Sequence, residues 1–171
     1  RPFGKNKPMS ALIKSAARSY AVWGVSLLCL GLALLTIRHR ELVESWPINW
    51  FLWQVLTGLI LMGLLIYQWA LLTARLVGTS QSSRKHYNWH RYVGVGMTAL
   101  FILHAVRFGY YWTSALAIIF LLNGFVGLLN KEVVTYKSRG LYLIWYGLHV
   151  SLSAVLMPLT ALHIWVALVF E

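Results

Sequence analysis

The sequence predicts an all-α integral membrane protein with five transmembrane helices. Three observations support this fold class. The chain of 171 residues is 59% hydrophobic with only 11% charged residues, and its mean hydropathy is +0.66. A soluble domain of this size cannot bury so much apolar surface. Five stretches are long and apolar enough to span a bilayer, and nine Trp and nine Tyr fit aromatic belts at its two interfaces.

The five expected spans follow one another with short connections. They cover residues 19–37, 50–76, 90–110, 112–130 and 140–170. The polar stretches 78–88 and 131–140 are expected to be loops. Residues 1–18 form a basic N-terminal segment with apolar residues at helical spacing, which is typical of a surface helix. Residues 19–171 are then one transmembrane domain, a four-helix-type bundle with an additional N-terminal helix.

The charges of the loops predict the orientation. Twelve of the fifteen Lys and Arg residues fall on the side of the N-terminus, and only Arg38, Arg40 and Arg107 fall on the other. The positive-inside rule therefore places the N-terminus in the cytoplasm and the C-terminus outside. The expected location is the inner (cytoplasmic) membrane of a bacterium. The net charge of +11 is explained by these loops, so nucleic acid is not an expected partner.

Cysteine and acidic residues are scarce, which excludes several kinds of site. Cys29 is the only cysteine, so an intrachain disulfide and an all-cysteine metal site are both excluded. There is no Asp, and Glu41, Glu44, Glu132 and Glu171 fall at expected helix ends or in loops. Transporters and proton pumps usually keep an ionisable carboxylate within the bilayer. The sequence disfavours both of these classes.

Four histidines recur at one interval. His90 and His104 lie fourteen residues apart in the third span, and His149 and His163 are fourteen apart in the fifth. At 3.6 residues per turn, fourteen residues bring both members of a pair to one helix face, about 21 Å apart along the axis. The third and fifth spans cross in the same direction because the fourth returns between them. We therefore expect His90 level with His149 (the inner pair) and His104 level with His163 (the outer pair).

Two imidazoles facing each other at each of two depths favour two b-type haems with bis-histidine iron. Such iron is six-coordinate and suited to passing single electrons. A structural zinc would need further ligands, and no Cys or carboxylate lies near either level. Small residues around the histidines would let helix backbones approach a porphyrin edge: Gly94, Gly96, Gly124, Gly127 and Gly147. The alternative is a purely structural role, in which these histidines only bridge helices by hydrogen bonds.

Haem propionates need cationic partners. Arg91 and Arg139 are candidates for the inner level and Arg107 for the outer, although each also suits an interfacial arginine that extends to water. Trp145 is expected either on the inner haem or in the aromatic belt. Of the remaining histidines, His39 is expected in solvent, and His86 is expected in the polar loop, where it is close enough in sequence to compete with His90 for iron.

Two stretches carry a resemblance to a known family. "LTGLILMGLLIYQWALLTARLVG…HRYVGVGMTALFILHA" and "SRGLYLIWYGLHVSLSAVLMPLTALH" resemble the ferric-reductase-like transmembrane domain, which includes NADPH oxidases, ferric reductases and the haem subunit of methionine sulfoxide reductase systems. The resemblance covers about residues 56–170. It implies that His90 and His149 hold an inner haem and His104 and His163 an outer one. A weaker resemblance joins "QVLTG" and "HAVRFGYYW" to the haem helices of bc-type cytochrome b.

The resulting hypothesis is a di-haem membrane cytochrome b that carries electrons across the membrane as a subunit of a redox complex. The donor is a cytoplasmic-side protein or a quinol, and the acceptor is an extracytoplasmic partner such as a cytochrome or iron–sulfur protein; reverse flow is the other possibility. The chain has no flavin or nicotinamide motif, because its near-match "GVGMTA" (94–99) falls within a span. Whether the chain itself is an enzyme is left open. The alternatives are a quinone-reactive cytochrome b subunit of a respiratory or photosynthetic complex, with Asn88, His86 or Ser138 near a quinone, and a non-redox scaffold or transporter.

Overall fold

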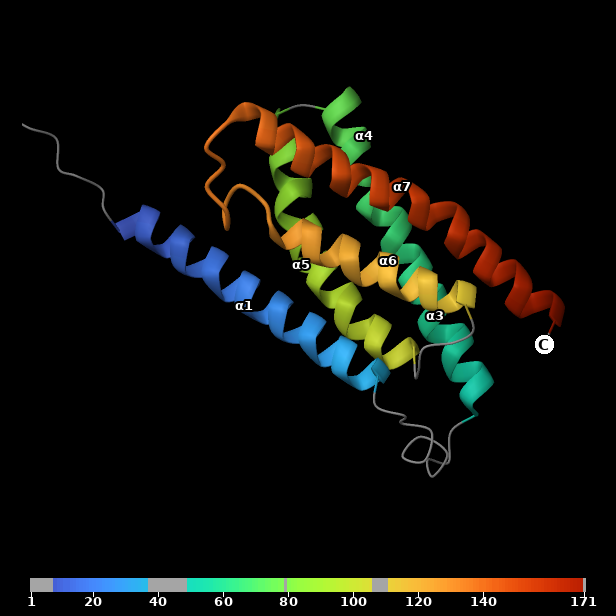
Figure 1. Cartoon of the computed structure of the whole chain (residues 1–171). Helices are drawn as coiled ribbons and strands as arrows, with labels where there is room; N and C mark the ends of the chain where they lie inside the picture. Colours follow the sequence, from blue (N-terminus) through green and yellow to red (C-terminus); the bar gives the residue numbers. More distant parts are fainter. Residues whose placement is uncertain (1–7, 37–48, 79, 106–110, 171) are drawn as a thin grey trace, which may run out of the picture.

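The computed structural model describes residues 8–36, 49–78, 80–105 and 111–170, and these are mostly helical with no strand among them. The helices are α1 (Pro8–Thr36), α3 (Trp50–Gln68), α4 (Ala70–Val77), α5 (Ser80–His104), α6 (Tyr111–Leu128) and α7 (Arg139–Phe170). The long helices run up and down in alternation, so α1, α5 and α7 share one direction and α3 and α6 the other (Figure 1). The all-α prediction is confirmed.

The helices pack around α5 and α6. α5 lies against α1, α3, α4 and α6, and α6 lies against α1, α5 and α7. A buried cluster of Phe101, Ala117 and Leu121 joins α5 to α6, with Phe101 stacked on Phe120 at a ring-centroid distance of 4.4 Å. The described parts of α5 and α7 do not pack closely along their lengths. A separation between these two parallel helices is therefore built into the fold.

Three helical stretches are long and apolar enough to cross a membrane: Trp50–Val77, Tyr111–Leu128 and Arg139–Val169. The first of these joins α3 and α4 across Trp69. Many large apolar side chains are exposed on these helices, as expected for surfaces that contact lipid. The helix count fits the five expected spans, although α1 contributes a shorter apolar helix, Tyr20–Leu34, and α5 begins with a polar segment.

One expected loop is helical instead. α5 begins at Ser80, so most of the polar stretch 78–88 forms its first turns. Gln, Lys and Arg have good helix propensity. Ser83 Oγ donates to the Ala74 carbonyl, which also accepts from the Gly78 N–H, so this contact ties the start of α5 to the end of α4. The chain therefore turns between α4 and α5 within very few residues. The expected connection at 131–140 lies between α6 and α7, and α1 includes residues 8–18 of the basic N-terminal segment.

Candidate functional site

The four histidines of the repeated interval meet in pairs between α5 and α7. The ring centroids of His90 and His149 are 6.0 Å apart and their planes are nearly perpendicular, at 85°. The centroids of His104 and His163 are 6.2 Å apart, with an interplanar angle of 88°. Two levels with almost the same geometry therefore lie about 21 Å apart along the helices.

The spacing within each pair suits one metal ion between the rings. A metal–imidazole bond is about 2 Å long and the ring centre lies roughly 1 Å beyond the nitrogen, so two rings on opposite sides of one ion have centres about 6 Å apart. The described residues contain no group of three or more His, Cys, Asp and Glu side chains placed to hold a metal. Among the described residues, each level thus brings together two imidazoles and no third side chain of these types.

A cavity of about 170 Å³ contains the inner pair. On the same measure a single water needs about 10–15 Å³, so the cavity admits a much larger group. Its lining is mostly apolar, and α1, α3, α4, α5, α6 and α7 all contribute to it. His90 and His149 line it together with Gly94, Gly124 and Gly127. The other two glycines that we expected near a porphyrin, Gly96 and Gly147, are exposed and have nothing close to them, so they do not line this cavity.

One histidine of each pair rests against a glycine of a neighbouring helix. A Cβ added at Gly127 would lie 3.1 Å from Cε1 of His149, and one added at Gly58 would lie 3.1 Å from Cε1 of His104. The absence of a side chain at these two positions therefore lets the imidazoles approach the α6 and α3 backbones. Sequence analysis identified Gly127 as small but did not single out Gly58.

Close to each of these glycines, a tryptophan joins two neighbouring helices by a hydrogen bond. Trp145 Nε1 donates to the Val126 carbonyl at 2.7 Å, next to Gly127, and the Trp145 ring lies parallel to His149. Trp53 Nε1 donates to the Leu103 carbonyl at 2.9 Å, next to His104. The structure places Trp145 beside His149 of the inner pair.

The Nδ1 atoms of the inner pair face protein. Nδ1 of His90 and of His149 are buried and have no hydrogen-bond partner within the usual distance. Because Nδ1 of each ring is enclosed by protein, Nε2 at the far end of the ring is the nitrogen available to a bound group.

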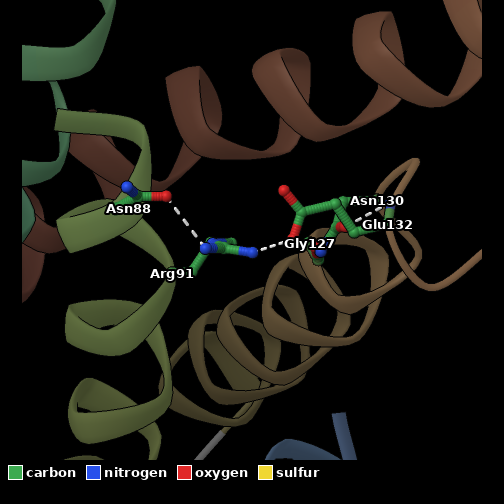
Figure 2. A network of polar contacts seen from close by, with 5 residues as sticks. All are labelled: Asn88, Arg91, Gly127, Asn130 and Glu132. Atoms are coloured by element: carbon green, nitrogen blue, oxygen red, sulfur yellow. Dashed lines mark hydrogen bonds and ion pairs between the residues drawn. The ribbon is translucent and has the colours of Figure 1, made fainter. Parts of the chain in front are cut away.

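Arg91 belongs to a polar network at the end of the bundle that carries the inner pair, as Figure 2 shows. It forms an ion pair with Glu132 and donates to Asn88 Oδ1 at 2.9 Å. The buried Asn130 accepts from the Glu132 backbone N–H and donates to the Gly127 carbonyl. This network joins the residue next to His90 to the glycine beneath His149. Arg91 lines the cavity but already has a carboxylate partner.

Of the other two expected arginines, only Arg139 lies in the part of the chain that the structure describes, and it is not brought to the cavity. Arg139 is exposed at the start of α7 and lines neither the inner cavity nor the polar hollow beside it. Arg107 lies outside the described residues. Arg75, at the end of α4, lines the cavity with His90 and His149, and its guanidinium lies 5.8 Å from the Tyr146 ring centroid. Sequence analysis used Arg75 only for orientation, and its position near the end of an apolar helix before the H-R pair was the available signal.

The turn between α6 and α7 is closed by aromatic residues. The Tyr136 hydroxyl donates to the Leu129 carbonyl, and its ring packs on Tyr142 and Trp145. Burial raises the pKa of Tyr136, with a smaller contribution from Tyr142, so the hydroxyl keeps its proton and remains a donor. The turn therefore holds Trp145, and with it His149, in place.

His86 is separate from the pairs. Its Nδ1 lies 2.9 Å from the Ser82 carbonyl of its own helix, and His86 does not line the cavity. His86 therefore lies apart from the inner pair in this structure. His39 lies outside the described residues.

A haem is compatible with the residues present. The paired rings, the separation between α5 and α7, the apolar cavity and the two glycines against the imidazoles all agree with a flat macrocycle between these helices. The fold and site define the class as a helical, membrane-type protein with two stacked histidine pairs. No known protein family, curated protein or solved structure matches the chain.

Proposed function

We propose that this chain is a di-haem, b-type electron-transfer subunit of a membrane redox complex. The observation that carries the proposal is the repeated pairing of His90 with His149 and of His104 with His163 at nearly equal distances. A single buried histidine is commonly a helix-bridging residue. Two pairs with the same spacing, the same separation and the same crossed planes are better explained by two copies of one ligand.

The chain's own residues would bind and orient the cofactors. His90 with His149, and His104 with His163, would hold the two haems, which would supply one-electron chemistry when bound. Gly58 and Gly127 let His104 and His149 lie close to neighbouring helices, while Trp53 and Trp145 hold those helices together. Among the cations, Arg75 is free of a carboxylate partner within the described residues and suits a haem carboxylate better than Arg91 does.

The two levels would carry electrons through the apolar part of the membrane. They are about 21 Å apart along α5 and α7, a large share of a hydrocarbon core about 30 Å thick. The basic loops put the inner pair on the cytoplasmic side and the C-terminus outside. The donor would then be a cytoplasmic flavoprotein or a quinol, and the acceptor an extracytoplasmic redox protein.

The test combines haem content with a reduced-minus-oxidised optical spectrum of the purified chain. The proposal predicts two haems per chain and a b-type spectrum. Replacing His104 and His163 together with Ala should remove one haem and leave the other. His86→Ala is the matched control, since His86 lies on the same helix one turn before His90 but outside the cavity, and it should keep both haems.

Two results would contradict the proposal. A colourless protein from cells with ample haem would exclude it. So would an unchanged b-type spectrum in the double variant. The polar residues considered for a quinone have structural partners instead: Asn88 accepts from Arg91, His86 contacts the Ser82 carbonyl, and Ser138 accepts from the Leu141 N–H at the start of α7.

A further inference from the structure

We infer that Thr57 is a positioning residue that holds His104 in the tautomer with its proton on Nδ1, which leaves Nε2 as the ligand atom. This inference deepens the proposed function and rests on it for the identity of the group that His104 binds. The arrangement of protons itself depends only on atoms of the chain.

Thr57 is buried and contacts His104 from α3. The threonine is 4% exposed, and its Oγ1 lies 3.1 Å from Nδ1 of His104. The same hydroxyl donates to the Trp53 carbonyl at 2.7 Å, with the Gln54 carbonyl at 3.3 Å. Carbonyl oxygens only accept, and a hydroxyl has a single proton. If that proton is used on Trp53, Oγ1 can only accept from His104.

The distances distinguish the two possible directions of this bond. O–H donors bind at 2.5–3.0 Å and N–H donors at 2.7–3.2 Å in typical proteins. The 2.7 Å contact to Trp53 therefore suits the hydroxyl proton, and the 3.1 Å contact suits an imidazole N–H donating to Oγ1.

Trp53 and Gly58 complete a seat for His104 on one face of α3. Trp53 and Thr57 share that face because they lie four residues apart, and Gly58 follows Thr57 directly. The Trp53 indole donates to Leu103, the residue before His104, and Gly58 lies beneath the ring. The contact with the α3 backbone at Gly58 thus fixes the position of the His104 ring. The hydrogen bond with Thr57 fixes which ring nitrogen carries the proton.

This seat has a consequence for the bound group. A hydrogen bond from the outer nitrogen of a ligating histidine fixes the ring and raises the basicity of the ligating nitrogen. A more basic ligand favours the oxidised metal. Among the described residues, no hydroxyl lies within hydrogen-bond distance of either Nδ1 in the inner pair, so the Thr57 contact distinguishes the outer level from the inner one.

The test compares Thr57→Val, which keeps the shape and loses the hydroxyl, with Thr57→Ser, which keeps the hydroxyl. Thr73→Val is the matched control, since Thr73 also donates to the carbonyl four residues before it but has no histidine contact. The first readout is the ¹⁵N-detected Nδ1–H of His104 in the reduced full-length chain. The wild type and Thr57→Ser should show a Nδ1–H that exchanges slowly with water, and Thr57→Val should lose that protection.

The second readout is a redox titration with haem binding. Thr57→Val should raise the midpoint potential of one haem only and weaken binding at that level by roughly 10-fold, while Thr57→Ser restores both. Thr73→Val should match the wild type.

The outcomes separate this inference from the proposed function. A proton on Nε2 of His104 in the wild type would overturn the inference. An unchanged Nδ1–H and unchanged potentials in Thr57→Val would overturn it too. A chain without haem would refute the proposed function, and the Nδ1–H of that same chain would still decide the tautomer, because its loss in Thr57→Val and return in Thr57→Ser support Thr57 as the acceptor.

Discussion

Two glycines on neighbouring helices contact the imidazoles and determine where the rings can lie. Gly58 and Gly127 each leave room for one ring, and a Cβ at either position would lie within 3.1 Å of a ring carbon. Such a contact is tighter than ordinary van der Waals packing, so the histidine must move if the glycine gains a side chain. Gly58 therefore determines whether His104 can take its position in the outer pair, and Gly127 does the same for His149 in the inner pair.

Valine at these glycines should remove haem selectively. Gly58→Val should deplete the outer haem and Gly127→Val the inner, because the branched side chain pushes His104 or His149 out of line with its partner. The measurement is haem content together with the reduced spectrum. Gly63→Val is the control on α3, where nothing lies within 4 Å of an added Cβ. Equal losses in all three variants would show that the glycines do not act through the histidines.

Sequence alone identified the four histidines because their function depends on an interval along one helix. The fourteen-residue spacing determines helix face and depth, and the structure brings the rings together as that spacing predicts. Thr57 and Gly58 could not be selected in this way, since their role depends on how α3 packs against α5. The positioning roles of Thr57 and Gly58 remain predictions, as do the ligand roles of the histidines.

At the scale of helices, the turn after α6 connects the inner level to the rest of the bundle. Asn130 is 3% exposed and bonds to both Glu132 and Gly127. Arg91 reaches the same turn from α5 (Figure 2). The turn therefore fixes the end of α6 on which His149 rests.

Asn130→Leu should destabilise the folded chain by about 1–3 kcal/mol, because the Glu132 N–H and the Gly127 carbonyl lose a buried partner. It should also lower haem occupancy at the inner level. Unfolding in detergent, followed by circular dichroism, measures the first effect. Asn88→Ala is the control: Asn88 is an exposed member of the same network, where such contacts contribute little. An equal loss in both variants would contradict the role of the turn.

The position of α4 places Arg75 beside the inner cavity. Positive charge near a haem favours the reduced state, so Arg75→Gln should lower the midpoint potential of the inner haem. A unit charge in a site of effective dielectric constant near 20 contributes roughly 1–2 kcal/mol. A potentiometric titration measures the change. Arg84→Gln is the control, since Arg84 lines only the neighbouring polar hollow. If Arg75→Gln and Arg84→Gln lower the potential by the same amount, the effect comes from the net charge of the chain and not from the position of Arg75 beside the cavity.

Helix bounds were predicted unevenly. The apolar stretches 50–76 and 140–170 agree closely with α3, α4 and α7, because length and apolarity determine them. The stretch 78–88 was predicted as a loop and is mostly helix. Its Ser and Gly suggested a loop, whereas Gln, Arg and Lys permit a helix and packing against α3 and α4 selects it.

For the whole molecule, the charge asymmetry and the direction of α5 and α7 together predict a vectorial path. α1, α5 and α7 run in one direction and α3 and α6 in the other (Figure 1). The basic residues gather at the end that carries the inner pair. The inner pair should then face the cytoplasm.

Fusions to the C-terminus test this orientation. Alkaline phosphatase after residue 171 should be active, because it folds only outside the cytoplasm, and a green fluorescent protein there should be dark. The same two reporters inserted between Lys131 and Lys137 should give the opposite pattern. Active phosphatase at the insertion together with fluorescence at the C-terminus would show the opposite orientation of the chain. That result would contradict the proposed direction of electron transfer.

The central claim is that crossed imidazoles hold an iron at each of two levels, and electron paramagnetic resonance of the oxidised protein tests it most directly. Perpendicular planes leave two iron d orbitals nearly equal in energy, which gives a strongly anisotropic low-spin signal, whereas parallel planes give a three-line rhombic spectrum. The 85° and 88° angles predict two signals of the first kind, one of which is lost in the His104→Ala, His163→Ala variant. A high-spin signal alone, or no iron signal, would contradict the account.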